Sequence, residues 1–112
     1  MNWSDLLKEI IQTYQKFGWT TRRVLLNKNL PDEFYEIRHL IHENIVIENS
    51  EVNAVWFSRR SGERETWELR LLSQSPFALI ETFEPNIAES ERDKIRAQMV
   101  EKLRKNLPKF KV

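Results

Sequence analysis

The sequence contains no cysteine among its 112 residues. This absence excludes disulfide bonds, thiolate zinc sites and thiol nucleophiles, and it fits a reducing compartment. The chain also has only two glycines, Gly18 and Gly62. Two widely separated glycines cannot build a dinucleotide-binding fingerprint or a P-loop, and no serine lies in a G-x-S-x-G turn. The sequence therefore predicts a non-catalytic protein without a cofactor, and catalysis by scattered residues is kept as a second alternative.

Long apolar runs and an excess of charge of one sign are also missing. No stretch approaches the roughly 20 apolar residues that are needed to span a bilayer. The N-terminal segment carries acidic residues and a lysine where a signal peptide would be apolar. The 18 basic and 17 acidic residues leave a formal net charge of +1, so no global field attracts nucleic acid or a membrane. We expect a cytoplasmic protein that does not contact membranes.

Aromatic residues, in contrast, are plentiful. The chain has four Trp, six Phe and two Tyr, and each can bury roughly 150–250 Å² on folding, which argues against disorder. A length of 112 residues suits one domain of ordinary size. Because no repeat, linker or low-complexity tract interrupts the chain, we expect a single α+β domain over residues 1–112.

Residues 52–84 form three extended runs joined by two short polar connections, which is typical of an antiparallel meander. The first connection contains Gly62, which suits a tight turn, and the second contains Pro76, which is expected at the entrance of a strand. The middle run alternates between apolar and polar side chains, so it is predicted to have one buried and one solvent-facing side. The apolar residues are Trp67, Leu69 and Leu71, and the polar residues are Thr66, Glu68 and Arg70.

Helices are predicted at both ends of the chain. Apolar residues recur at steps of three and four over residues 3–17 and again over residues 95–107. Residues 19–26 and 45–48 are predicted strands, and strict alternation in the first places Arg22 on one face and Arg23 on the other. The 32–43 segment fits both a short helix and a strand, and we favour the helix.

These elements predict an α+β fold, a two-layer sandwich in which an antiparallel sheet of four to five strands is covered by the N- and C-terminal helices. Both helices are expected on one face of the sheet. The first meander strand carries Val55, Trp56 and Phe57 in succession, so both of its faces are apolar. If the helices cover Trp56, then Val55 and Phe57 need another cover, either the 32–43 segment or a partner.

The expected partner is a second copy of the chain. The predicted interaction surface is the second face of the sheet, with Val55, Phe57, Ala78 and Ile80. A contiguous apolar patch usually marks an interface, and two-fold self-association is the commonest way for a small protein to cover one. The sequence therefore predicts a small protein-interaction or assembly module that forms a homodimer.

A weak nucleic-acid-binding domain is the first alternative. Its predicted contacts are two basic clusters, one at the first meander turn and one near the C-terminus. The clusters are Arg59, Arg60 and Arg64, and Lys102, Arg104 and Lys105. Arginines beside strand aromatics can bind single strands by combining charge with base stacking. Glu63 and Glu65 cancel much of the charge at the turn, so nucleic acid ranks below a protein partner.

The two histidines, His39 and His42, lie beside Glu36 and Glu43. One Glu-x-x-His unit is present here, whereas carboxylate-bridged metal sites need two such units and further carboxylates. The H-E-x-x-H zinc spacing is also absent. The sequence therefore predicts no metal site.

Overall fold

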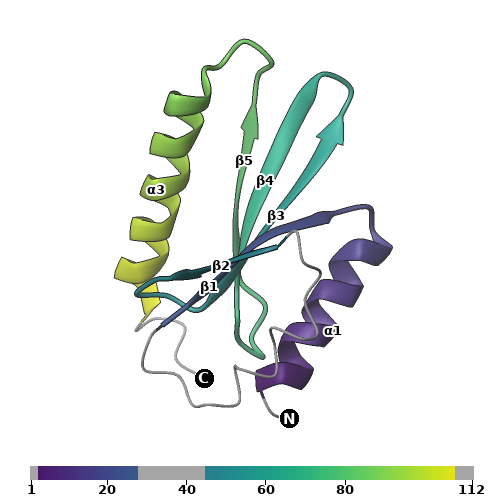
Figure 1. Ribbon diagram of the computed structural model, residues 1–112, viewed down its shortest axis with the longest axis vertical. Helices are drawn as coiled ribbons and strands as arrows, with labels where there is room; N and C mark the ends of the chain where they lie inside the picture. Colours follow the sequence, from purple (N-terminus) through teal and green to yellow (C-terminus); the bar gives the residue numbers. More distant parts are fainter. Residues whose placement is uncertain (1–2, 28–44, 108–112) are drawn as a thin grey trace.

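The computed structural model describes residues 3–27 and 45–107 (Figure 1). This part of the chain forms two helices and five strands. In chain order they are α1 (Trp3–Lys16), β1 (Thr20–Leu26), β2 (Val46–Asn49), β3 (Ala54–Ser61), β4 (Arg64–Leu71), β5 (Ala78–Phe83) and α3 (Glu89–Asn106). The 32–43 segment, for which a short helix is predicted, lies outside the described residues.

The five strands form one sheet in the order β2-β1-β3-β4-β5. The pairs β1–β3, β3–β4 and β4–β5 are antiparallel, whereas β1 and β2 are parallel. The predicted α+β class, the sheet and its meander are thus confirmed. The parallel pair differs from the predicted antiparallel sheet. Parallel neighbours need a long connection between them, and the residues that connect β1 to β2 include the 32–43 segment, whose conformation the sequence leaves open. The direction of β2 could therefore not be predicted.

The turn between β3 and β4 is a tight hairpin. Ser61 pairs with Arg64, so only Gly62 and Glu63 form the loop. Gly62 has a φ of +64°, and no residue other than glycine has a positive φ in the described part of the chain. A positive φ at the first loop residue alone defines a type II′ turn, whose twist matches that of the flanking strands. The predicted turn at Gly62 is confirmed.

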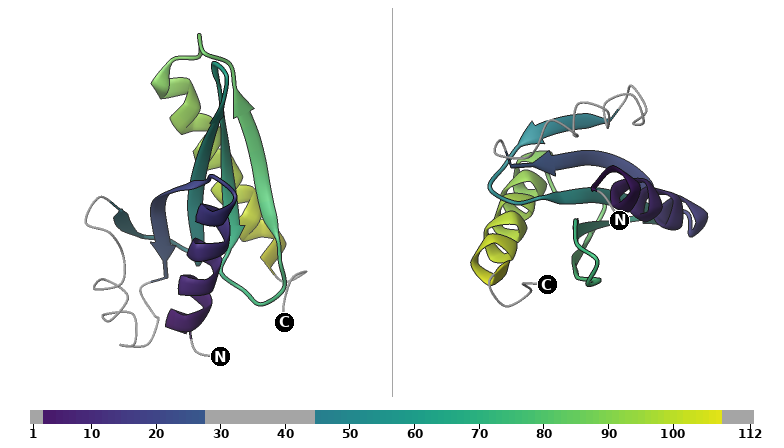
Figure 2. Two further views of the ribbon diagram at one scale, coloured as in Figure 1. Left: turned by 90° about the vertical axis from the view of Figure 1, so that its right-hand side faces the viewer. Right: turned by 90° about the horizontal axis from the view of Figure 1, so that it is seen from below.

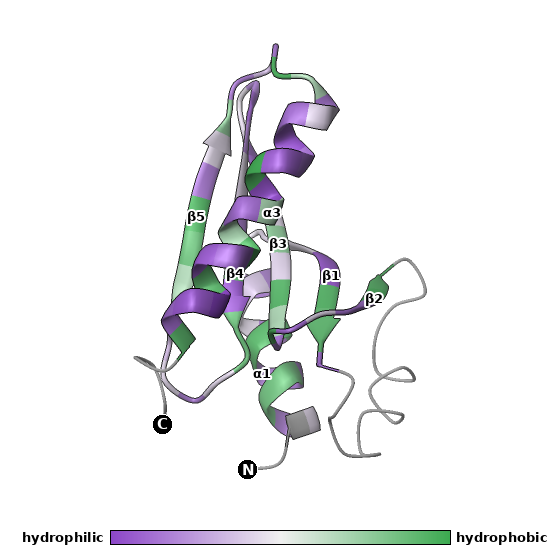
Figure 3. Cartoon of the chain, turned by 90° about the vertical axis from the view of Figure 1, so that its left-hand side faces the viewer, coloured by the Kyte–Doolittle hydropathy of each residue, from purple (hydrophilic) through white to green (hydrophobic). Residues whose placement is uncertain are grey.

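The two helices pack on opposite faces of the sheet. On one face, Trp56 belongs to a core cluster with Met99 and Leu103 of α3. On the other face, Phe57 belongs to a second cluster that contains Leu7 of α1. Figure 3 shows α3 lying across the face that is turned to the viewer. The expectation that both helices share one face is therefore wrong, because each apolar face of β3 is covered by its own helix.

The sheet is strongly twisted, and this twist limits what each helix can cover. β1 and β2 cross β4 and β5 at a steep angle (Figures 1 and 2), as the right-handed twist of successive strands dictates. α1 packs over β1, and α3 packs over β4 and β5. Among the described residues, the helices therefore leave Ile80 of β5 exposed on the α1 face and Val46 of β2 exposed on the α3 face.

Candidate interaction surface

The outer edge of β5 carries backbone groups without a strand partner in the described part of the chain. The Leu71 N–H donates to the Phe77 carbonyl at 2.9 Å, so these two residues form a hydrogen-bonded pair. Because hydrogen-bonded and non-hydrogen-bonded pairs alternate in an antiparallel ladder, every second residue of β5 points its N–H and C=O away from β4. These residues are Ala78, Ile80 and Thr82.

Within the strand itself, β5 lacks the usual protection against further pairing. Natural edge strands are commonly short, bulged, or interrupted by lysine or proline. β5 has six residues, its pairing with β4 runs without a register shift, and it contains neither lysine nor proline. Glu81 is its one charged residue. In Figure 3, β5 lies at the margin of the sheet, next to α3.

The side chains on this edge are partly apolar and accessible. Ile80 is 59% exposed, which makes it one of the most exposed large apolar side chains in the described residues. Ala78 beside it is half-buried. Thr82 is exposed, and its hydroxyl lies 3.0 Å from that of Thr66 on β4. The β5 edge therefore offers hydrogen-bonding groups and an apolar side chain in one continuous strip.

The predicted interaction surface is divided by the position of α1. Val55 and Phe57 are fully buried beneath α1, so they do not lie on an exposed face as the sequence suggested. Ala78 and Ile80 remain on the part of the same face that α1 does not reach. The physical reason is that α1 supplies, within the chain, the cover that Val55 and Phe57 need.

A buried polar contact marks the boundary between the covered and the open half of the α1 face. Glu68 of β4 lies opposite Phe57 on one side and Ile80 on the other, and it is only 8% exposed. Tyr14 of α1 donates its hydroxyl to the Glu68 carboxylate and stacks on Phe57, with ring centroids 3.9 Å apart. Burial and this hydrogen bond raise the pKa of Tyr14, so its phenol stays protonated. The predicted solvent-facing side of β4 is therefore wrong at Glu68.

The arginines of the hairpin have partners of their own. The Arg59 guanidinium lies 4.7 Å from the centre of the Trp19 ring and donates to the Phe17 carbonyl at 3.3 Å. Arg64 forms an ion pair with Glu84 at 3.3 Å, and Arg60 is exposed. Two of the three arginines are therefore engaged within the chain, which leaves less positive charge available for binding nucleic acid.

The second basic cluster lies far from the first. Arg104 pairs with Glu101 and with Glu51, while Lys102 and Lys105 are exposed on the last turns of α3. The C-terminal end of α3 and the tip of the β3–β4 hairpin lie at opposite ends of the molecule (Figure 1). The two clusters therefore do not combine into one surface, and nucleic-acid binding stays an untested alternative.

No group of three or more His, Cys, Asp or Glu side chains is placed to hold a metal ion within residues 3–27 and 45–107. His39 and His42 lie outside the described residues, so the structure says nothing of the Glu-x-x-His unit. None of the described helices is long and apolar enough to cross a membrane.

Comparison with known protein families, with curated proteins and with solved structures gives no significant match to this chain. The interpretation of its function therefore rests on the geometry described above, and the β5 edge is the surface that carries it.

Proposed function

We propose that this protein is a non-catalytic assembly module that forms a two-fold dimer by pairing β5 with β5 of a second copy. The observation that carries the proposal is the unprotected edge of β5, where the backbone groups of Ala78, Ile80 and Thr82 point outward beside an Ile80 side chain that is 59% exposed. Adding a strand to such an edge satisfies backbone groups and buries apolar side chains in one step.

One antiparallel register fits the sequence of β5. With the two-fold axis at Ile80, this residue pairs with Ile80 of the partner subunit, and Ala78 pairs with Thr82 of the partner subunit. All three outward-facing residues then have an N–H to donate, so the interface contains complete hydrogen-bonded pairs. The two Ile80 side chains lie next to each other on the α1 face, where close cross-strand apolar pairs stabilise a sheet.

The neighbouring registers are less favourable. An axis at Glu81 would place two like charges directly opposite each other, which destabilises a strand pair. An axis at Leu79 would pair Thr82 with Pro76 of the partner subunit, and proline has no N–H to donate. Self-association by β5 therefore has a preferred geometry, as a specific interface requires.

The test compares the masses in solution of the wild type and two matched variants. Ile80→Lys places two like charges at the proposed axis, whereas Val46→Lys makes the same change at an exposed residue, 53% accessible, on the opposite edge strand β2. Sedimentation velocity should give twice the 13.5 kDa chain mass for the wild type and for Val46→Lys at high protein concentration. Ile80→Lys should remain a monomer with an unchanged circular dichroism spectrum.

Two results would refute the proposal. A wild-type protein that stays monomeric over the whole accessible concentration range would exclude self-association. A dimer that survives Ile80→Lys and dissociates with Val46→Lys would assign the interface to the β2 edge.

A further inference from the structure

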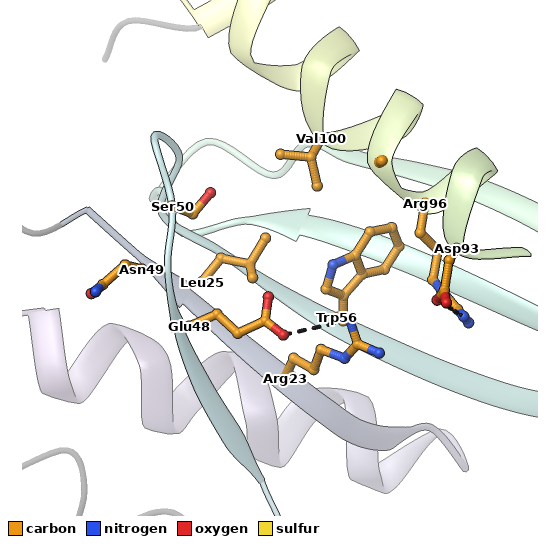
Figure 4. A pocket seen from close by; sticks show the side chains of 10 residues that line it. Arg23, Leu25, Glu48, Asn49, Ser50, Trp56, Asp93, Arg96 and Val100 are labelled. Atoms are coloured by element: carbon orange, nitrogen blue, oxygen red, sulfur yellow. Dashed lines mark hydrogen bonds and ion pairs between the residues drawn. The ribbon is translucent and has the colours of Figure 1, made fainter. Parts of the chain in front are cut away.

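A pocket of about 480 Å³ lies on the α3 face, over the part of the sheet that α3 leaves uncovered. Leu25 of β1 and Trp56 of β3 lie at its base, and Val100 of α3 lines one side (Figure 4). Ala97 of α3 also lines the pocket. The end of β2 lines the opposite side. The lining is mixed, because apolar side chains form the base and the α3 side while charged and polar groups surround them, and a concave site of this size can hold a small molecule.

A β-bulge directs two successive arginines to this face. The pairing of β1 with β3 shifts register just before Arg23, so Arg22 is the extra residue. Arg22 Nε donates to Ser58 Oγ at 2.7 Å, and its guanidinium lies 5.9 Å from the centre of the Trp67 ring. Arg23 lies opposite Trp56 and lines the pocket. The regular alternation that the sequence predicts is therefore wrong at Arg22.

A third arginine, Arg96 of α3, lines the other end of the pocket and is held in place. Its guanidinium lies 4.3 Å from the centre of the Trp67 ring and 5.9 Å from that of Phe83. One terminal nitrogen donates to both Asp93, at 2.6 Å, and Glu89. Arg96 is therefore fixed in place and neutralised by two carboxylates, one of which, Asp93, also lines the pocket, so it is a poor anchor for an anionic ligand.

Arg23 is the arginine that can bind an anion. Its ion pair with Glu48 is a single contact of 3.5 Å, and the two side chains are 35% and 42% exposed. An exposed pair of this kind contributes little to stability, so Glu48 can give way to another anion. A guanidinium has five N–H donors in a planar fork that matches a carboxylate or a phosphate. The geometry around Arg23 thus favours bidentate recognition of an oxyanion.

We propose that this pocket binds a small organic anion whose carboxylate or phosphate group displaces Glu48 from Arg23 and whose apolar body fills the space beside Ala97 and Val100. Because Trp56 is only 2% exposed, the ligand contacts the edge of its ring rather than stacking on it. Ala97 is exposed on the pocket side, and its small side chain leaves room for the ligand. The site is distinct from β5, so it exists in the monomer and the dimer alike.

The experiment titrates the protein with phenylacetate, phenyl phosphate and the neutral 2-phenylethanol, and follows the indole N–H resonance of Trp56 by NMR. Both anions should cause a saturable shift. The neutral compound should bind at least about tenfold more weakly, because a hydrogen bond to a charged group changes a dissociation constant by at least that factor. The stronger-binding anion shows whether the site prefers a phosphate or a carboxylate.

Four variants locate the site. Arg23→Gln should weaken anion binding about tenfold or more, and Glu48→Gln should strengthen it by removing the competing carboxylate. Ala97→Phe should abolish binding by filling the pocket, and since Ala97 is exposed the fold should persist. Arg60→Gln, at an exposed hairpin arginine, is the matched control and should bind like the wild type. The absence of a saturable shift with either anion, or equal affinity in the wild type and Arg23→Gln, would overturn the proposal.

Discussion

Tyr14 links α1 to two neighbouring strands of the sheet, β3 and β4. Its ring stacks on Phe57, and its hydroxyl donates to Glu68, a carboxylate that is 8% exposed. A buried carboxylate is costly unless its oxygens accept hydrogen bonds. The phenol therefore supplies a hydrogen bond to a buried carboxylate and extends the apolar core beneath α1.

Tyr14→Phe tests this role. The substitution keeps the ring on Phe57 and removes only the hydrogen bond to Glu68, so we expect a loss of about 1–3 kcal/mol in the free energy of unfolding. Urea denaturation measures the difference. Thr13→Ala, at the neighbouring exposed residue, is the control and should change stability by less than about 0.5 kcal/mol. A Tyr14→Phe protein as stable as the wild type would show that water replaces the phenol at Glu68.

The raised pKa of Tyr14 adds a dependence on pH. The unfolded chain releases the phenol proton near the ordinary tyrosine value of about 10, whereas the folded protein keeps it. The stabilisation is therefore complete below about pH 10 and is lost as the pH rises above that value. Between about pH 10 and 11, the free energy of unfolding should fall more steeply for the wild type than for Tyr14→Phe. If the free energy of unfolding falls equally steeply with pH in the wild type and in Tyr14→Phe, the burial of this phenol is contradicted.

At the scale of elements, the hairpin depends on Gly62. Its φ of +64° lies in the left-handed region, and a Cβ at this position would meet no atom within 4 Å. Gly62→Ala therefore introduces backbone strain without a steric clash, and it should lower the free energy of unfolding by about 1 kcal/mol. Thermal denaturation checks this, with Ser61→Ala on the adjacent exposed residue as the control. A free energy of unfolding that is unchanged in Gly62→Ala would contradict the assigned turn.

Most elements could be predicted from the sequence because each has a local signal. Apolar periodicity indicated both helices, and alternation with Gly62 and Pro76 indicated the meander. The face that each helix covers has no such signal, because α1 and α3 meet the sheet through contacts between segments far apart in the chain. The run Val55, Trp56 and Phe57 indicated two apolar faces, and the structure gives one helix to each.

The sites were harder to predict than the fold. Ile80 and Ala78 were identified as surface residues, but for a face that α1 partly covers. The edge position of β5 could have been inferred, since the last strand of a meander pairs only with its predecessor unless the chain returns beside it. The bulge before Arg23 has no signal in the sequence, because Arg22 fits either face equally well. The pocket that depends on this bulge was therefore missed.

At the scale of the whole molecule, the sheet is covered diagonally. α1 and α3 lie on opposite faces and over opposite halves of the twisted sheet. Val55 and Phe57 need no second copy of the chain to cover them, because α1 buries both within the chain. In the described part of the chain the β5 edge remains open, so the proposed self-association moves from the face of the sheet to its edge.

The most direct test of this edge-to-edge dimer is amide hydrogen exchange along β5, measured by NMR at low and high protein concentration. In the monomer, the amides of Leu79, Glu81 and Phe83 are bonded to β4 and should exchange slowly, while those of Ala78, Ile80 and Thr82 should exchange fast. We predict that the fast amides become protected as concentration rises. If they still exchange fast when sedimentation shows a dimer, the chains associate through another surface.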